Sequence, residues 1–519
     1  MNAHDPAERP SAAGEQTTPR VTFIFAGLML AMLAASLNQT VLNPALPTIV
    51  GELHGVDRML WVITAYILAS TIMMPVYGKL GDLFGRRPLL LTALTIFVLG
   101  SVLGALAGDI TWLIIARAVQ GAGGGGLMVL SQATIADVIP ARQRGRYLGI
   151  MSSVFAVSSV AGPLLGGWFT EGPGWRWVFW INVPLGAIAV VAAVVFLRLP
   201  RVSGSGRRID ILGMAVLSVV TTLLVLVATW GGSQYPWTSP IMLALIAATV
   251  AGAVLFVAVE RRAHEPVIGL HLFRDRNFDL VTAAGLLISI ALFGVAAYMP
   301  TYLQMVAGKS ATTAGLLMLP MMGPMFVTST LAGRFVTRTG RYKRIPLVGS
   351  VLVTVGLVLL STLDAETPLW MLCCWLAVLG VGFGTAMQIL VLVVQNSFPI
   401  EEVGTATAGN NYFRQIGATL GSAVVGSVFA ARLAGGLSGT GVGEPESLTP
   451  ATVQGLPDTL RQSVLEAYND ALVPIYLYIA PLVMVAGVLL CFVVEKPLAT
   501  TIVRKNDSVP TGPAATAST

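Results

Sequence analysis

The sequence predicts an all-α integral membrane protein with about fourteen transmembrane helices, arranged as two six-helix halves with two inserted central helices. Composition is the first observation: of 519 residues, 55% are hydrophobic and 11% are charged, whereas a soluble domain carries about 25% charged residues. Long apolar stretches between charges are the second, and an uneven distribution of Lys and Arg is the third. Together they indicate that a lipid bilayer surrounds most of the chain.

The apolar stretches define the predicted spans. A transmembrane helix needs about 20 predominantly apolar residues and pairs its backbone polar groups within the segment. Of these stretches only Val403–Ala431 is interrupted by a charge, Arg414, while Arg117 directly precedes the stretch Ala118–Ala136 in the fourth span. The stretch from Ile211 to Val259 is long enough for two helices. Counting that stretch twice gives fourteen. The stretches are Val21–Gly51, Met59–Gly78, Pro88–Gly108, Ala118–Ala136, Tyr147–Thr170, Trp177–Leu197, Ile211–Val259, Leu280–Gly308, Ser310–Gly333, Ile345–Leu363, Thr367–Ile400, Val403–Ala431 and Ala471–Val494.

Lys and Arg gather on one side of these spans. Of the 31 basic residues, two lie within spans and five lie in outer connections, which leaves 24 for the two tails and the other loops. Cytoplasmic loops carry an excess of Lys and Arg, so both termini are expected in the cytoplasm, with the spans in a bacterial plasma (inner) membrane. The five outer residues are Arg58, Arg176, Lys309, Arg432 and Arg461.

The spans divide the chain into predicted parts. The outer loop over 432–470 is expected to contain a short surface helix, because Leu460, Val464 and Ala467 follow helical spacing. The parts are a disordered cytoplasmic tail (1–20), an N-terminal six-helix half (21–198), two inserted helices (199–262), a C-terminal six-helix half (263–495) and a cytoplasmic tail (496–519).

The most specific motif, GKLGDLFGRRPLL, follows the second span. Gly78 and Gly85 permit a very short loop where two helix ends approach each other. Asp82 can cap a helix N-terminus or pair with a basic side chain, in a contact that forms in one transporter state and breaks in another. Arg86 and Arg87 alone would indicate only a cytoplasmic loop, but the full spacing predicts an inner gate.

This segment resembles the loop motif of the major facilitator superfamily, G-x-x-x-D-(R/K)-x-G-R-(R/K), with Leu83 where that motif has a basic residue. The resemblance implies that Asp137, at the cytoplasmic end of the fourth span, joins the charge network of the loop. A degenerate copy without the acid lies at Gly333–Arg344. This copy agrees with an internal repeat of two six-helix halves.

The fourth span contains IIARAVQGAGGGG, with Arg117 and Gln120 inside the bilayer. A charged side chain there costs about 2.5–3.5 kcal/mol on insertion scales, so Arg117 must face a cavity or a partner. The glycines also match G-x-G-x-x-G, but no strand precedes them. Close helix packing is therefore expected in place of a dinucleotide site.

The fifth span contains VAGPLLGG, in which Gly162 and Gly166 have G-x-x-x-G spacing around Pro163, and Gly167 follows. This pattern predicts a bent helix that packs closely on a neighbour. It resembles the superfamily motif associated with exporters and favours efflux over uptake. The strings WRWVFWINVPLG, LNQTVLNPALP and NNYFRQIGATLGS resemble the fourteen-helix drug/proton antiporter branch, and the resemblance covers Val21–Val494.

The charges within the spans differ from those of that branch, which usually has an acid where this chain has Asn38. No Asp or Glu lies well inside a predicted span, and the deep ionisable residues are Arg117 and Arg414. The architecture that the chain resembles places Asn38, Arg117 and Arg414 at a central cavity. A dehydrated cation needs a counter-charge there, so neutral, zwitterionic or anionic amphiphiles are expected over dicationic dyes.

Two alternatives to this interpretation stay open. Arg414 could pack against helix ends or backbone carbonyls and take no part in transport. Arg117 could be neutralised by backbone carbonyls and by outer acids such as Asp109, which would leave the cavity without a charge preference. If Arg117 instead faces the cavity, a proton could still be carried by a peripheral acid such as Asp137 or by the substrate, and Arg117 would modulate coupling electrostatically.

The predicted function is therefore secondary active export of hydrophobic or amphiphilic compounds, such as drugs and antibiotics, by proton antiport with alternating access. The alternative is an exporter or flippase of an endogenous lipid or metabolite. The proton gradient supplies the energy, so no cofactor is expected. The expected partners are a small amphiphilic substrate, protons and the bilayer, and the chain is expected to be a monomer.

Other functional classes are excluded by missing motifs. The one GKS, at Gly308–Ser310, lacks the upstream glycine of a P-loop. There is no pore motif or carboxylate ring of a channel, and no nucleophile with a base for an enzyme. Basic residues do not form the clustered face that nucleic-acid binding needs. Cys373, Cys374 and Cys491 lie in apolar segments, so neither a disulfide nor a metal site is expected.

Overall fold

The computed structural model describes residues 18–55, 58–197, 209–232, 234–364, 366–438, 452–453 and 455–500. Among these residues the regular elements are helices, with one isolated bridge between Gly231 and Tyr235. Thirteen helices are long and apolar enough to cross a membrane, and a shorter apolar helix at Arg344–Leu360 completes a set of fourteen spans. The predicted all-α membrane fold is thus confirmed.

Six spans form the N-terminal half, two are inserted, and six form the C-terminal half. The N-terminal helices are α1 (Thr18–Glu52), α2 (Met59–Phe84), α3 (Arg86–Ala105), α4 (Ile110–Val138), α5 (Ala141–Glu171), and the sixth span formed by α6 (Trp177–Trp180) and α7 (Asn182–Phe196). The inserted helices are α8 (Ile211–Trp230) and α9 (Pro240–Glu260), followed by the short 3-10 helix η2 (Leu270–Arg274). The C-terminal helices are α10 (Arg276–Met305), α11 (Ala311–Leu316) with α12 (Leu319–Thr339), α13 (Arg344–Leu360), α14 (Leu369–Ser397), α15 (Val403–Leu437) and α17 (Asp458–Cys491).

The last span differs from the expectation. The predicted surface helix is the beginning of α17, which runs without a break from Asp458 into the membrane. The reason is that its apolar stripe continues in phase: Val464, Tyr468 and Leu472 are all buried, at the spacing of one helix face. Tyr468 packs on Phe429 of α15 with ring centroids 5.0 Å apart. The outer connection is therefore shorter than the predicted loop.

A single residue connects α2 to α3. Gly85 follows the end of α2 and precedes Arg86, the first residue of α3. Its φ of 91° lies in the region that favours glycine. The tight turn brings the side chains of Asp82 and Arg86 together at one end of the bundle.

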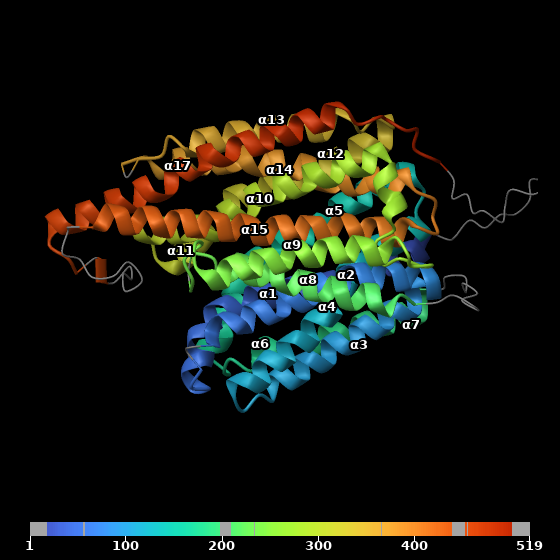
Figure 1. Ribbon diagram of the computed structural model, residues 1–519, viewed down its shortest axis with the longest axis horizontal. Coiled ribbons are helices and arrows are strands. Elements are labelled where there is room, and N and C mark those ends of the chain that lie inside the picture. Colours follow the sequence, from blue (N-terminus) through green and yellow to red (C-terminus); the bar gives the residue numbers. More distant parts are fainter. Residues whose placement is uncertain are drawn as a thin grey trace, which may run out of the picture.

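The two halves are arranged around the inserted pair (Figure 1). We call the end where α1 begins and α17 ends the terminal end; it lies at the right of Figure 1, and sequence analysis assigns it to the cytoplasm. Most of the N-terminal half occupies the lower part of the view and most of the C-terminal half the upper part, whereas α5 lies beside α12 and α14. Contacts between the halves pair α2 with α15 and α5 with α12, while α8 touches both α2 and α15.

Candidate functional site

Asp82, at the end of α2, reaches across to the other half of the molecule. Its Oδ1 accepts a hydrogen bond from the backbone N–H of Gly404 at 3.1 Å. Its Oδ2 accepts two from Thr405, from the backbone N–H at 2.6 Å and from the hydroxyl at 2.8 Å. N–H groups in the first turn of a helix lack partners within it, and the helix dipole favours an anion there. Asp82 therefore caps α15 across the boundary between the halves.

Arg86 holds this carboxylate in place. Its side chain is buried and forms ion pairs with Asp82 at 3.0 Å and with Asp137 of α4 at 2.7 Å. It also donates hydrogen bonds to the carbonyl oxygens of Ala133 and, in the C-terminal half, Ile400. Burial of a guanidinium is tolerated when its donors are satisfied in this way. The structure thus brings the acid, the arginine and the second acid of the sequence motif into one network.

Two other motif residues have different surroundings. Gly78 lies in the α2/α15 contact, where a Cβ would overlap the side chain of Ala408 and the carbonyl oxygen of Gly404. Arg87 lies outside the network, because its Nη2 donates at 2.9 Å to the carbonyl oxygen of Val194 in α7. Gly78 therefore permits the contact between the halves, whereas Arg87 binds within one half.

A second contact between the halves joins α5 to α12 and involves the degenerate copy of the motif. A Cβ at Gly333 would overlap the carbonyl oxygen of Gly145. Arg142, at the start of α5, donates to the carbonyl oxygens of Thr337 at 3.3 Å and Arg338 at 3.2 Å. These carbonyls belong to the last turn of α12, where a cation is favoured. Sequence analysis did not identify Arg142.

Arg144, one turn from the beginning of α5, is also absent from the sequence prediction. Its side chain is buried and donates to the carbonyl oxygens of Ala136 at 2.8 Å and Ile139 at 3.0 Å, which end α4. A longer bond of 3.4 Å reaches the carbonyl oxygen of Gln395 in α14. Arg144 thus connects α5 and α4 of the N-terminal half with α14 of the C-terminal half.

Deeper in the membrane, amide side chains connect the halves. Asn411 of α15 donates to Oε1 of Gln132 in α4 at 2.7 Å. Gln395 of α14 donates to the backbone carbonyl of Gln132 at 3.1 Å. Hydrogen bonds are strong in a low dielectric. Because these amides are neutral, their burial leaves no charge that needs a counter-charge. We call these three buried residues the neutral seam; they lie deeper in the membrane than the charged network.

Arg414 lies next to this seam. Its Nη1 donates to Oδ1 of Asn411 at a long 3.3 Å, and Nε is buried with no hydrogen-bond acceptor among the described residues. Its stem passes over Gly285 of α10, whose Cβ position would lie 3.3 Å from Cγ of Arg414. No described carboxylate forms an ion pair with it. Arg414 is therefore a membrane-depth cation with unused donor capacity.

Arg117 has a different environment. It is 2% exposed, donates from Nε to the carbonyl oxygen of Val62 at 3.2 Å and from Nη1 to Oε1 of Gln120 at 2.6 Å. Its guanidinium carbon lies 4.4 Å from the centroid of the Tyr66 ring, within cation–π range. Arg117 is thus enclosed by α2 and α4 of one half.

Asn38 is enclosed as well. It is 1% exposed, and its Oδ1 accepts a hydrogen bond at 3.3 Å from Asn182 of α7. Gln120, which accepts the hydrogen bond from Arg117, itself donates to the hydroxyl of Ser101 at 2.6 Å. These positions differ from the expectation that Asn38 and Arg117 border a central cavity, and Gln120 is buried with them. Polar partners within the N-terminal half bury all three in this state.

The glycines of the fifth span pack against α1. Cβ atoms at Gly162 and Gly166 would overlap Thr40 and the backbone of Val41, respectively. Pro163 is exposed on another face of α5, and a Cβ at Gly167 would meet nothing within 4 Å. The close contact thus depends on Gly162 and Gly166, while Gly167 has room.

Burial shows which end of the bundle is closed. At the terminal end, 386–395 of α14 and 403–412 of α15 are buried on every side. Toward the opposite end, Gln39 and Asn43 are exposed on α1. An amide that faces hydrocarbon would lose its hydrogen bonds at a cost of several kcal/mol. These exposed amides therefore indicate that this part of α1 does not face hydrocarbon, whereas the terminal end is closed by buried contacts.

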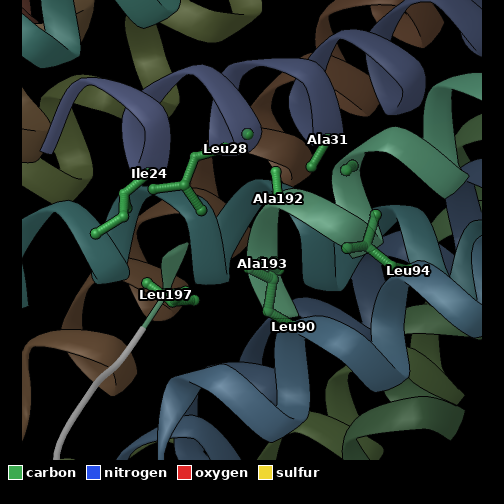
Figure 2. Close-up of a pocket in the computed structure, with 10 residues that line it drawn as sticks. Ile24, Leu28, Ala31, Leu90, Leu94, Ala192, Ala193 and Leu197 are labelled. Carbon is green, nitrogen blue, oxygen red and sulfur yellow. The ribbon is translucent and has the colours of Figure 1, made fainter. Parts of the chain in front are cut away.

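A pocket elsewhere does not belong to this site. It lies between α1, α3 and α7, and the labelled side chains in Figure 2 surround an apolar space. All of its lining residues are Ile, Leu, Ala or Gly: Ile24, Gly27, Leu28, Ala31, Leu90, Leu94, Ala189, Ala192, Ala193 and Leu197. A polar substrate group would find no hydrogen-bond partner there, so the pocket is a gap in helix packing.

The chain is similar to known transporters over most of its length. The model of the Major Facilitator Superfamily matches residues 28–210 and 206–422. An uncharacterised MFS-type transporter of Mycobacterium tuberculosis is 39% identical over 94% of this chain and 72% of its own length. A multidrug transporter protein of Bacillus subtilis, MdtP, is 36% identical over 88% of this chain and 85% of its own length.

A further relative and one solved structure extend the comparison. Multidrug resistance protein 3 of Bacillus subtilis is 30% identical over 92% of this chain and 96% of its own length. The crystal structure of a human organic anion transporter aligns with a TM-score of 0.60, covering 93% of this chain and 100% of that one, at 16% identity. At that identity the structural likeness concerns the fold alone.

Proposed function

The chain belongs to the Major Facilitator Superfamily, a family of transporters, and on that premise we propose that it exports hydrophobic or amphiphilic small molecules by proton antiport. The observation that carries the proposal is the charged cap of Asp82 on α15, because it joins the two halves at one end only. Contacts of this kind can break and re-form as access alternates. Relatives named as multidrug transporters support export of drug-like compounds.

The proposed orientation places the terminal end in the cytoplasm of a bacterium, with the spans in its plasma membrane. Twenty-four of the 31 basic residues fall on this side by sequence, which agrees with the excess of Lys and Arg in cytoplasmic loops. The structure then represents a state closed to the cytoplasm. Substrate would leave from the opposite side, as export requires.

Arg414 supports a preference for neutral, zwitterionic or anionic amphiphiles. It has a donor without an acceptor and no described acid beside it. A dicationic dye would add positive charge next to this guanidinium in a low dielectric. A substrate carboxylate or sulfonate would instead gain charge-assisted hydrogen bonds there.

The test uses purified full-length protein in proteoliposomes with an imposed pH gradient. Radiolabelled norfloxacin serves as the zwitterion, anilinonaphthalene sulfonate as the anion and propidium as the dication. We expect gradient-driven transport of the first two and about tenfold slower transport of propidium, a difference of about 1.4 kcal/mol. Gradient-independent transport would contradict proton antiport, and rapid propidium transport would contradict the substrate class.

Arg414→Ala separates the role of this side chain from that of the fold. It should slow the anion more than the zwitterion, and Arg117→Ala serves as the comparison because Arg117 is enclosed by its own half. Equal rates of anion transport in wild type and Arg414→Ala would show that Arg414 only packs. An equal loss for all three probes would indicate a structural defect.

A further inference from the structure

Two carboxylates face each other where the inserted helices meet the terminal end. Asp210 caps α8, with Oδ1 accepting a hydrogen bond from the backbone N–H of Gly213 at 2.8 Å. Glu260, the last residue of α9, accepts one through Oε1 from the backbone N–H of Val267 at 3.2 Å. In each carboxylate the second oxygen, Oδ2 or Oε2, is buried and has no hydrogen-bond partner in the described part of the chain.

Gly213 brings these carboxylates close together. The position of a Cβ on Gly213 would lie 2.9 Å from Oε1 of Glu260 and would overlap Oδ2 of Asp210. Both acids therefore border the same small volume above one glycine. The side chain of Glu260 is 97% buried, since the residue is only 3% exposed.

The charged groups around this carboxylate pair do not neutralise it. Lys79 of α2 is committed to Glu265, with Nζ 2.5 Å from Oε2. Arg261 and Arg262 follow Glu260 but are exposed. No ion pair joins a described cation to Asp210 or Glu260. With all four groups ionised, one lysine would face three carboxylates.

Two carboxylates that border one small volume repel each other, and a buried carboxylate oxygen without a partner loses its hydration as well. One proton relieves both problems, because it converts an oxygen without a donor into a hydroxyl that can bond to the facing carboxylate. Two carboxylates at one site can share a single proton. Oδ2 of Asp210 and Oε2 of Glu260, which have no donor, are thus the oxygens that a proton would occupy.

The carboxylate pair is connected to the gate through α8. Thr221 of α8 shares a hydrogen bond of 2.8 Å with Tyr412 of α15. Separation of α2 from α15 must therefore disturb the surroundings of α8 and admit water.

We propose that Asp210 and Glu260 form a proton-binding site that holds one shared proton while the terminal end is closed and releases it to water there when α2 and α15 separate. The step breaks one carboxyl O–H bond and transfers the proton to water, leaving two carboxylates. The inference rests on the proposed proton antiport and identifies where this chain, which has no acid well inside a span, carries the proton.

Other acids near the gate are already occupied or differently placed. Asp82 and Asp137 are paired with Arg86. Asp279 also has one unpartnered oxygen, but it lies in the first turn of α10, where the helix dipole stabilises the ionised form. In the carboxylate pair Asp210 also lies at a helix N-terminus, but Glu260 is the last residue of α9, where the helix dipole disfavours an anion.

The experiment compares Asp210→Asn and Glu260→Gln with wild type in proteoliposomes, using radiolabelled norfloxacin. Asn caps a helix as well as Asp does, so Asp210→Asn should fold even if Glu260→Gln does not. We expect transport driven by a pH gradient to fall at least about tenfold in both variants. Counterflow, which needs no net proton movement, should stay within about twofold of wild type.

Glu265→Gln is the matched control, because it removes a nearby carboxylate that is paired with Lys79 and partly exposed. It should retain gradient-driven transport. An equal loss in Glu265→Gln would overturn the proposal by showing that charge around Lys79, and not a shared proton, matters. Wild-type coupling in Asp210→Asn would overturn it directly, whereas a wild-type protein without coupling would instead contradict the proposed function.

An infrared measurement provides a readout that needs no substrate. A protonated carboxyl group absorbs apart from a carboxylate, and the wild-type protein should show this band at neutral pH and lose it at alkaline pH. Either Asp210→Asn or Glu260→Gln should remove the band, and Glu265→Gln should keep it. A band that persists in both variants would place the proton elsewhere and reject this site.

Discussion

The two contacts that close the terminal end occupy equivalent places in the repeat and differ in chemistry. In the α2/α15 contact, Asp82 accepts hydrogen bonds from the start of the facing helix. In the α5/α12 contact, Thr337 stands four residues after Gly333, as Asp82 does after Gly78. There the polarity is reversed, because the backbone of α12 accepts hydrogen bonds from a side chain of α5.

The difference indicates that the two contacts close the terminal end in different ways. The α2/α15 contact depends on buried charges, those of Asp82 and Arg86. The α5/α12 contact depends on backbone approach at Gly145 and Gly333, with an exposed arginine at its edge. We infer that the first contact switches between states and the second acts as a hinge, and the following predictions test this distinction.

The largest effect is expected from Asp82→Asn. Asparagine retains one acceptor oxygen but removes the charge that faces Arg86 and the α15 N-terminus. Transport of norfloxacin should fall more than about tenfold, with a melting temperature within a few degrees of wild type. Thr337→Asn, at the equivalent position, should stay within about twofold. Normal transport by Asp82→Asn would reduce the motif to a topology signal.

Gly166→Val should come next, because it forces α5 away from α1 and so displaces the helix that carries the α5/α12 contact. We expect about a tenfold loss of transport or a leak of protons through the protein. Gly167→Val is the control, since a Cβ there meets nothing within 4 Å. Equal transport by the two variants and by wild type would exclude a role for this packing.

Arg144→Ala should reduce stability more than transport. The substitution leaves the buried carbonyl oxygens of Ala136 and Ile139 without their donor. Hydrogen bonds to a charged group contribute about 1.5–3 kcal/mol each, so the melting temperature should fall by several degrees. Thermal unfolding in detergent measures this fall. An unchanged melting temperature would mean that water replaces the guanidinium without loss.

Arg142→Ala should have the smallest effect. Its two hydrogen bonds to α12 are exposed and long, at 3.2 and 3.3 Å, and exposed interactions of this kind contribute less than about 1 kcal/mol. Transport should remain within about twofold of wild type. A loss as large as that of Asp82→Asn would show that both contacts switch, and the comparison drawn above would be incorrect.

Local patterns in the sequence predicted much of this molecule. Charge-free stretches predicted the fourteen spans, because hydrocarbon excludes charge wherever a helix crosses it. The motif around Asp82 was recognisable because its acid, glycines and arginines lie within ten residues of one another. The continuation of α17 to Asp458 could not be predicted, since charges on its exposed side conceal an unbroken apolar stripe.

Contacts between distant segments were beyond the same patterns. Asn411 and Gln132 are common polar residues separated by 279 positions, and nothing in their neighbourhoods relates them. Arg142 and Arg144 appear in the sequence only as part of a basic loop. Arg117 was recognised as a buried charge. The sequence did not show that its side chain is enclosed by Tyr66 and Gln120, because Tyr66 lies on a different helix and meets it only in the folded protein.

The outer inserted helix has a practical consequence for handling the protein. Met242 and Glu260 are the only buried residues of α9, so most of its apolar surface is left for lipid to cover. We expect that stripping lipid during purification loosens the α8–α9 hairpin before the two halves. Extraction into lipid nanodiscs should therefore preserve the response of the protein to pH, which harsh detergent should destroy. A delipidated sample that still binds substrate can already have lost this response.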